Sequence, residues 1–404
     1  MRFFKLHLMA KYSIKQILLT NQSWWWFHEK YKATLRPAIV TCVTKLLSCK
    51  NIIRGFREYR CSNPNCSHIK RVFFTCKCRA CSSCGKKATE IWVRKQNQIL
   101  PNTSWQHITF TMPCELWDFF WYNRKLLNLI GSIAASCIMT LSKKKKILPG
   151  MFIAIHTFGR DLKRNVHIHL SVTTGGLSED RTQWKNMFFH QATLMRMWRY
   201  QIISLFRQEQ SQLIIPPSIK EQLNNNFTFS KLLDQLYKKV WIVHCAKPTA
   251  DHKQNVSYLS RYLKRPAIAE SRLKHYNGDE ITFKYLDHKT NAIRNFTLTV
   301  EQFIARFVQH IPDTGFRMIR YYGFLSNRTR GELLPIVYQL LGQDSANQIT
   351  LPTYAELMQK NFNFNPLTCV LCGQQLVLSL TCFGKTTVSE LLDFHRELAL
   401  LQNF

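Results

Sequence analysis

The stretch MFIAIHTFGRDLKRNVHIHLSV, residues 151–172, contains two strand-like segments joined by a polar connector. Alternate residues of a strand face the same side, so His167 and His169 share one face of the second segment. His156 lies on the first segment, and antiparallel pairing would bring it beside them. Three converging imidazoles predict a divalent-metal site. Ordinary polar residues on a solvated sheet face are the alternative.

The surrounding sequence predicts a mixed α+β fold, in which an antiparallel sheet is flanked by helices and preceded by a helical N-terminal domain. Alternating apolar residues indicate strands, and apolar residues at helical spacing indicate helices. Strands are expected at 105–113 and 239–248 and a hairpin at 275–289, with helices at 27–49, 126–142, 182–208, 255–266 and 299–311. The apolar stretch 126–142 is short for a membrane span and predicts a buried helix.

The charge of the chain predicts a polyanionic partner. Among 404 residues, 56 Lys and Arg face 24 Asp and Glu, a formal net charge of +32. Nucleic acid is the usual partner of such a chain, and a ribosome-adjacent or membrane-surface role is the alternative. Aromatic residues make up 13% of the chain and suit single strands, whose bases stack on rings. With no evident signal peptide, we expect a cytoplasmic, nucleoid-associated protein with no membrane partner.

Cysteines cluster early in the chain, in CSNPNCSHIKRVFFTCKCRACSSC, residues 61–84. Disulfides are rare in the cytoplasm, so this density predicts a thiolate metal site. The expected structural zinc ligands are Cys61, Cys66, Cys81 and Cys84, with Cys76 and Cys78 as alternative ligands or packed thiols. A separate C-x-x-C, Cys369 and Cys372, precedes a strand-like run and indicates either half of a metal site or a structural turn.

The helix predicted at 255–266 places Tyr258 and Tyr262 four residues apart, on one helical face. A tyrosine pair that packs against the sheet is the simplest interpretation. Beside a metal site, however, a tyrosine hydroxyl can attack a DNA phosphate and form a covalent phosphotyrosine. Arg261, Lys264 and Arg265 would bind the same DNA and stabilise the developing negative charge.

The chain resembles the rolling-circle insertion-sequence transposases of bacteria, the two-tyrosine group of the HUH endonuclease superfamily. The resemblance covers about residues 55–375 and includes the cysteine cluster, HITFTMP, the His-Ile-His segment, YLSRYLKRPAIAESRL, ITFKYLDH and FVQHIPDTGFRMIRYYGFLSN. It implies an HUH-type sheet and a Mg²⁺ or Mn²⁺ ion at the histidines. It also implies that Tyr258 and Tyr262 nick single-stranded or hairpin element ends and target DNA through 5′-phosphotyrosine, without a nucleotide cofactor.

This interpretation divides the chain into three regions. A helical, zinc-binding DNA-recognition domain is expected at 1–100, the catalytic domain at 101–345 and a C-terminal region at 346–404. His156 is the expected third ligand of the catalytic metal, with Glu270 or a water molecule as alternatives. A plasmid-type replication initiator or relaxase would share the chemistry, and a non-enzymatic zinc-dependent DNA-binding protein is the alternative from another class.

Overall fold

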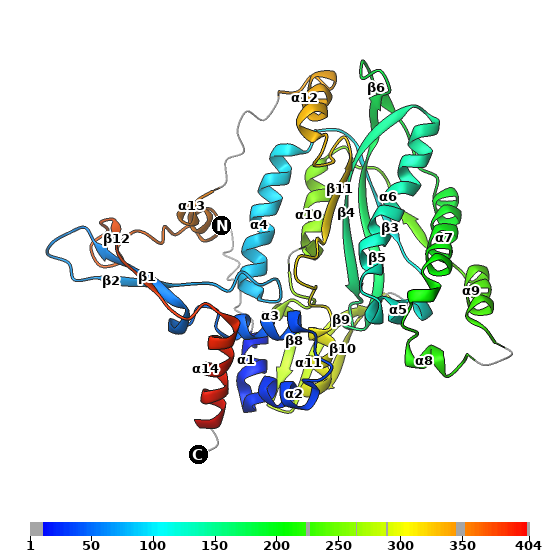
Figure 1. The fold of residues 1–404 in the computed structure, drawn as a ribbon. Helices are drawn as coiled ribbons and strands as arrows, with labels where there is room; N and C mark the ends of the chain where they lie inside the picture. The colour runs from blue at the N-terminus through cyan, green and yellow to red at the C-terminus, as the bar shows by residue number, and fades with distance from the viewer. Residues whose placement is uncertain (1–10, 224–226, 264, 288–289, 345–351, 402–404) are drawn as a thin grey trace.

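The computed structural model describes residues 11–223, 227–263, 265–287, 290–344 and 352–401. Its largest sheet is antiparallel, with the strand order β11-β4-β5-β3-β7 and β6 paired to β5. The strands are β3 (Trp105–Phe110), β4 (Ile147–Phe158), β5 (Arg164–Ser178), β6 (Trp184–Asn186), β7 (Val243–Cys245) and β11 (Ile319–Gly323). Helices lie on both faces of this sheet (Figure 1). The mixed α+β class with an antiparallel sheet is thus confirmed.

The long hairpin of β4 and β5 forms the centre of this sheet. Its connector is closed by a hydrogen bond from the Gly159 backbone N–H to the Lys163 carbonyl, 2.9 Å long. The register places His156 opposite His167 and Ala154 opposite His169. The predicted hairpin and its register are therefore confirmed, and the three histidines lie on one face.

The opposite face of the sheet packs on the largest apolar core. Ile153 and Ile155 from β4 and Ile168 and Leu170 from β5 are fully buried there. The helices of this layer are α5 (Trp117–Tyr122), α6 (Leu126–Lys144), α7 (Gln191–Gln208), α8 (Pro217–Lys220) and α9 (Phe229–Lys238). Among the described helices, α6 alone is long and apolar enough to span a membrane, and half of its most apolar segment is buried within the protein.

The helix expected at 182–208 begins later than predicted. Trp184–Asn186 forms the edge strand β6 on Gly175–Leu177, and α7 starts only at Gln191. Gly175 permits this close approach, because a Cβ atom there would lie 2.6 Å from the Trp184 ring nitrogen. Pairing with the long β5 strand has therefore overridden the local helical pattern.

The histidine-bearing face is covered by α4 (Ser82–Ile99), α10 (His252–Leu263) and α12 (Arg330–Leu340). Trp92 from α4, Val256 and Leu259 from α10, and Phe152 from β4 are buried in one cluster. The ribbons of α4 and α10 run side by side over the sheet (Figure 1), and residues of the two helices contact one another. This packing fixes α10 across the centre of the sheet.

A second module joins the N-terminal helices to a segment from late in the chain. The helices are α1 (Ile14–Leu19), α2 (Ser23–Tyr31) and α3 (Pro37–Leu47), and the late segment comprises β8 (Leu273–Tyr276), β9 (Glu280–Asp287), β10 (Ala292–Thr299) and α11 (Val300–Val308). The predicted hairpin turn is present, with Gly278 at φ +107°. Ile17, Val43, Phe283 and Phe303 share one buried core. The strands β8, β9 and β10 and the helix α11 therefore pack with the N-terminal helices rather than on the large sheet.

The third sheet is small and combines two strands from early in the chain with one from late in the chain. It has the antiparallel order β12-β1-β2, with β1 (Gly55–Cys61), β2 (Ile69–Phe73) and β12 (Leu376–Phe383). It extends away from the body of the protein, with α13 (Tyr354–Phe362) near it (Figure 1). The C-terminal helix α14 (Val388–Leu401) packs on α3, where Ser48 Oγ and His395 Nε2 lie 2.8 Å apart. The C-terminal elements β12 and α14 therefore pack directly on the N-terminal elements β1 and α3.

Candidate functional site

Three histidines converge on the face of the sheet that α10 covers. The ring centroids of His156 and His169 lie 4.7 Å apart, and those of His167 and His169 lie 4.9 Å apart. One ring nitrogen from each histidine lies within 4.8 Å of the others, a spacing suited to one divalent ion. His156 and His169 are buried, and His167 is half-buried. Hence the rigid hairpin, rather than a loop, holds these side chains in place.

The electrostatics at His167 and His169 favour uncharged imidazoles. Burial lowers the pKa of His167, and burial together with the neighbouring His167 and His107 lowers the pKa of His169 well below its usual value. A neutral imidazole retains a lone pair for a metal. His167 Nδ1 lies 2.9 Å from the Asn165 carbonyl oxygen and can donate to it, which leaves Nε2 as the acceptor.

His107 is a member of the site that sequence reasoning missed. It lies on β3, and its Nε2 atom is 3.1 Å from His169 Nδ1, with the two rings stacked. Thr109 Oγ1 lies 3.3 Å from the same His107 atom. Both residues stand in QHIT at alternate positions, so the strand pattern placed them on one face. The order of strands in the sheet, which puts β3 beside β5, was not visible in the sequence.

The predicted tyrosines lie on α10, which crosses this same face. Ser171 Oγ on β5 lies 3.4 Å from Asn255 Oδ1 on α10, a direct contact between the histidine strand and the helix. The backbone positions of Tyr258 and Tyr262 are one and two turns further along this helix. The side chains of Tyr258, Arg261 and Tyr262, and the whole of Lys264, lie outside the described residues.

A groove of about 720 Å³ opens beside the histidines. Its lining includes His107, Thr109, His244, Lys247, Lys253 and Asn255. It therefore runs from the histidine face along the first turns of α10. Exposed ammonium groups at Lys247 and Lys253 suit a phosphate backbone, and Asp251 is the acidic residue in this lining.

Four cysteines gather between α3 and the start of α4. Their Sγ atoms lie 3.7 Å apart for Cys49–Cys84 and Cys49–Cys81, and 3.6 Å apart for Cys76–Cys84. A zinc ion bonded to four thiolates at about 2.3 Å requires sulfur–sulfur distances of about 3.8 Å. All four cysteines are buried. This set therefore fits a tetrahedral zinc site.

A second set contains Cys61, Cys66, Cys369 and Cys372, whose sulfur atoms all lie within 4.8 Å of one another. The four ligands predicted for one zinc are thus divided between two clusters, and the single-site assignment was wrong in its pairing. Cys76 belongs to the first cluster, and Cys78 belongs to neither. Cys49 was missed because it follows a helix and stands apart from the other cysteines. Glu270, the alternative metal ligand, instead accepts a hydrogen bond from the Ile14 backbone, 3.0 Å long.

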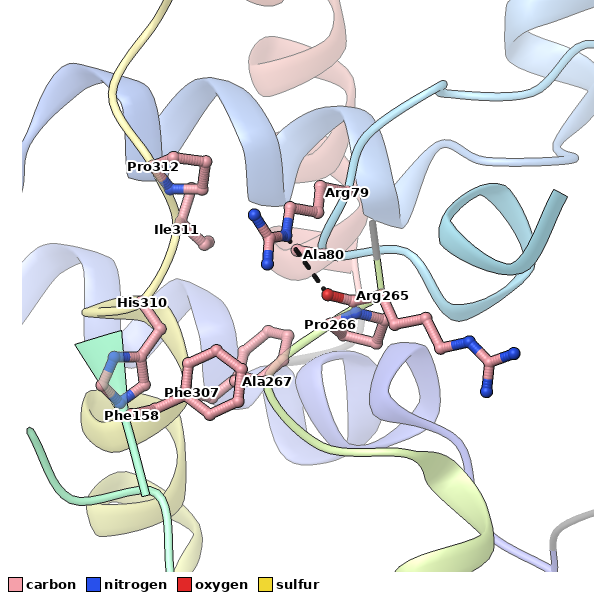
Figure 2. A pocket seen from close by; sticks show the side chains of 10 residues that line it. All are labelled: Arg79, Ala80, Phe158, Arg265, Pro266, Ala267, Phe307, His310, Ile311 and Pro312. Carbon is pink, nitrogen blue, oxygen red and sulfur yellow. Dashed lines mark hydrogen bonds between the residues drawn. The ribbon is translucent and has the colours of Figure 1, made fainter. Parts of the chain in front are cut away.

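A small cavity of about 20 Å³ lies where the cysteine loop meets the segment after α10 and the end of α11. Arg79 Nε donates a 3.3 Å hydrogen bond to the Arg265 carbonyl oxygen, while the half-buried Arg265 side chain turns away from His310 (Figure 2). Burial lowers the pKa of Arg79 to about 10, so it remains charged at neutral pH. This contact links the cysteine loop to the segment that follows α10.

His310 lies on the wall of this cavity, and we predict that it makes the free energy of unfolding depend on pH. Burial, more than the nearby arginines, lowers its pKa to about 3, although the Leu162 carbonyl 3.0 Å from Nε2 favours the charged form. The unfolded chain takes up a proton below about pH 6.5, whereas the folded chain does not until about pH 3. Stability is therefore lost as the pH falls from 6.5. We expect this histidine to lower the free energy of unfolding by about 2 kcal/mol at pH 5 relative to pH 7.

Chemical denaturation of the His310→Gln variant at pH 7 and pH 5 checks this value. Glutamine retains an N–H donor for Leu162 but does not titrate, so its loss of unfolding free energy should be smaller by about that amount. Zinc loss and protonation of the other histidines at low pH should affect the wild-type and variant chains equally. The difference between the two chains therefore reports His310 alone. Equal losses in the two proteins would contradict the assignment of His310 as a buried neutral group.

Two descriptions of known protein families match this chain. "Transposase zinc-binding domain" matches residues 19–112, which include the first cysteine cluster. "Putative transposase" matches residues 150–332, which include the histidine hairpin and α10. The chain thus resembles a transposase that carries a zinc-binding domain.

Full-length relatives identify the family. "Transposase for insertion sequence element IS801" of Pseudomonas savastanoi pv. phaseolicola is 41% identical over 375 residues, which cover 92% of this chain and 90% of that protein. "Putative transposase y4qJ" of Sinorhizobium fredii (strain NBRC 101917 / NGR234) is 27% identical over 385 residues, 89% of this chain and 94% of that protein. No solved structure matches. The chain belongs to the IS91 family of insertion-sequence transposases, together with the IS801 transposase.

Proposed function

We propose that this transposase nicks and rejoins single DNA strands through 5′-phosphotyrosine intermediates, with Tyr258 and Tyr262 as its nucleophiles. The observation that carries the proposal is the position of α10. This helix crosses the sheet face that bears His156, His167 and His169, and Asn255 contacts the histidine strand through Ser171. Phenol nucleophiles and metal ligands would then face one scissile phosphate, as in an HUH-type catalytic domain.

The proposed reaction keeps the number of phosphodiester bonds constant at every step. A tyrosine oxygen attacks the phosphorus, the bond to the 3′ oxygen breaks, and that oxygen takes up a proton to become a free hydroxyl. The tyrosine retains the 5′ phosphate. In rejoining, a 3′-hydroxyl attacks this phosphotyrosine and releases the phenol. Each step exchanges one phosphodiester for another, so no nucleotide cofactor is required.

The residues of the site have distinct proposed roles. His156, His167 and His169 would hold a Mg²⁺ or Mn²⁺ ion, which would polarise the phosphate oxygens. Tyrosine has an ordinary pKa of about 10, so positive charge from Arg261, Lys264 and Arg265 would favour its phenolate and bind the phosphate. Two nucleophiles would allow a donor end and a target strand to be held together.

The groove and the charge of the chain support single-stranded DNA as the substrate. The groove beside His107 meets the first turns of α10, and exposed Lys247 and Lys253 line it. Single-stranded or hairpin element ends would lie there, with target DNA entering the same site. This assignment places the transposase on DNA in the bacterial cytoplasm.

A structural zinc at Cys49, Cys76, Cys81 and Cys84 would support recognition of the element ends. These cysteines lie within the matched transposase zinc-binding domain. The Arg79–Arg265 contact joins this loop to the segment that follows the tyrosine helix. DNA bound by the zinc domain would therefore be positioned relative to the nucleophiles.

A replication initiator or relaxase remains the second candidate for the chemistry, because those enzymes would use the same residue types. The two named relatives, both transposases matched along most of their length, favour transposition.

One experiment distinguishes the proposed nuclease from a DNA-binding protein without catalysis. The purified chain is incubated with labelled single-stranded element ends and Mg²⁺ or Mn²⁺. We expect a nicked strand and a protein–DNA adduct that survives denaturant. Binding without either product would refute the nuclease.

DNA binding should depend strongly on salt, because each neutralised phosphate releases counterions. With roughly six to ten phosphates contacted, affinity should fall about 10³- to 10⁵-fold between 50 and 200 mM salt. Removing the groove charges in Lys247→Gln and Lys253→Gln should each lower the salt slope by about one. Lys143→Gln, at the exposed end of α6, is the matched control. An affinity that does not change with salt would contradict the charge argument.

A further inference from the structure

The sheet β12-β1-β2 is assembled from strands that lie far apart in the chain. β12 pairs with β1 along its whole length, from Gly55 opposite Phe383 to Cys61 opposite Leu376. Cys61 ends β1 and Cys66 follows in the turn before β2. Cys369 and Cys372 lie in the turn that leads into β12. The pairing therefore brings two cysteine turns together at one end of the sheet.

The geometry of these four thiols suits a metal, and none of them is in a disulfide. Sulfur–sulfur distances are 3.3 Å for Cys61–Cys372 and 3.7 Å for Cys66–Cys369. A disulfide requires about 2.05 Å, whereas zinc in a thiolate tetrahedron separates its ligands by about 3.8 Å. The Asn63 backbone N–H donates to Cys61, and His68 Nδ1 lies 3.1 Å from Cys369 Sγ. Such outer hydrogen bonds orient metal-bound thiolates.

This sheet has too small a core to hold three strands by burial alone. On β12, Leu376 is buried, but Leu378, Leu380 and Phe383 are exposed by 54%, 52% and 78%. Every residue of β2 is likewise exposed or half-buried. A small sheet with little apolar burial needs another source of stability, and in many small domains a metal supplies it.

We propose that Cys61, Cys66, Cys369 and Cys372 bind a second zinc ion, which clasps the C-terminal region onto the N-terminal zinc domain. Binding would replace the thiol protons with the metal and involves no change of oxidation state. The matched transposase zinc-binding domain ends at residue 112 and therefore contains only half of this site. The proposal does not depend on the nuclease activity.

Zinc stoichiometry of purified full-length variants tests the clasp. Cys372→Ser should lose one zinc ion per chain relative to the wild type, whereas Cys372→His, which restores a ligand atom, should retain it. Cys382→Ser is the matched control, because Cys382 is an exposed cysteine on β12 outside both clusters. Zinc at the Cys49, Cys76, Cys81 and Cys84 site should be present in all four proteins and does not affect the comparison. A folded Cys372→Ser chain with the zinc content of the wild type would overturn the proposal.

Thiol alkylation of the wild-type, zinc-loaded chain tests the site without any substitution. Cys372 and Cys382 are both exposed, so they should react alike unless a metal holds the thiolate. We expect Cys372 to be protected at least tenfold relative to Cys382 and to lose this protection after chelation. Equal reaction rates for Cys372 and Cys382 in the zinc-loaded protein would overturn the proposal, whatever the variants show.

Discussion

The double variant Tyr258→Phe/Tyr262→Phe should form no covalent DNA adduct, because it lacks both proposed nucleophilic oxygens. Each substitution removes one hydroxyl and keeps the ring, so the helix that carries them should remain folded. The single variants should still nick single-stranded DNA but fail to complete transposition, which requires two linked strands. Denaturing gels of labelled element ends, run beside a transposition assay, measure both effects.

The control for this experiment is a chain with two other tyrosines changed. Tyr122→Phe/Tyr200→Phe alters side chains that are 39% and 62% exposed on α5 and α7, on the far side of the sheet. It should form the adduct at the wild-type level. A denaturant-resistant adduct from the Tyr258→Phe/Tyr262→Phe chain would exclude the phosphotyrosine mechanism while leaving the zinc clasp untouched.

Loss of a proposed histidine ligand should have the second large effect. His169→Ala removes a side chain that lies at the centre of the cluster, beside both His156 and His107. Metal stabilisation of a phosphoryl transition state contributes several kcal/mol, so cleavage should fall by roughly 10³-fold or more. Binding of DNA should persist, because the net charge of +32 is spread over the whole chain.

Two further variants separate a metal role from a structural one. His107→Gln changes a residue that contacts His169 and lies outside the three-histidine set, so metal affinity should fall about 10- to 100-fold and added Mn²⁺ should restore cleavage. His275→Ala, at an exposed position on β8, should cleave like the wild type. If His169→Ala cleaves at the wild-type rate with the same metal dependence, the three-histidine site is refuted.

The part of the site that follows from local sequence was predictable. The alternation around His167 and the short connector determine both the face and the pairing partner, so His156 could be placed from the sequence. His107 could not, because its position depends on β3 packing beside β5. Strand order within a sheet is a property of tertiary packing that one strand's pattern does not encode.

The cysteines show the same limit more sharply. The spacing of Cys61 and Cys66, and of Cys81 and Cys84, identified two ligand pairs, but spacing does not say which pairs meet. Cys81 and Cys84 meet Cys49 and Cys76 through local chain folding, whereas Cys61 meets Cys372 only after the whole chain has turned back. Long-range closure of this kind is decided by packing, which sequence spacing alone does not reveal.

The pairing of β1 with β12 also sets an order of events during synthesis. A ribosome extends the chain at about 5–20 residues per second, and roughly 300 residues separate the end of β2 from the start of β12. The strand β12 is therefore synthesised about 15–60 s after β1 and β2. A polypeptide released before β12 would keep its histidines and tyrosines but leave β1 as an open edge, so this sheet closes only after β12 has been synthesised.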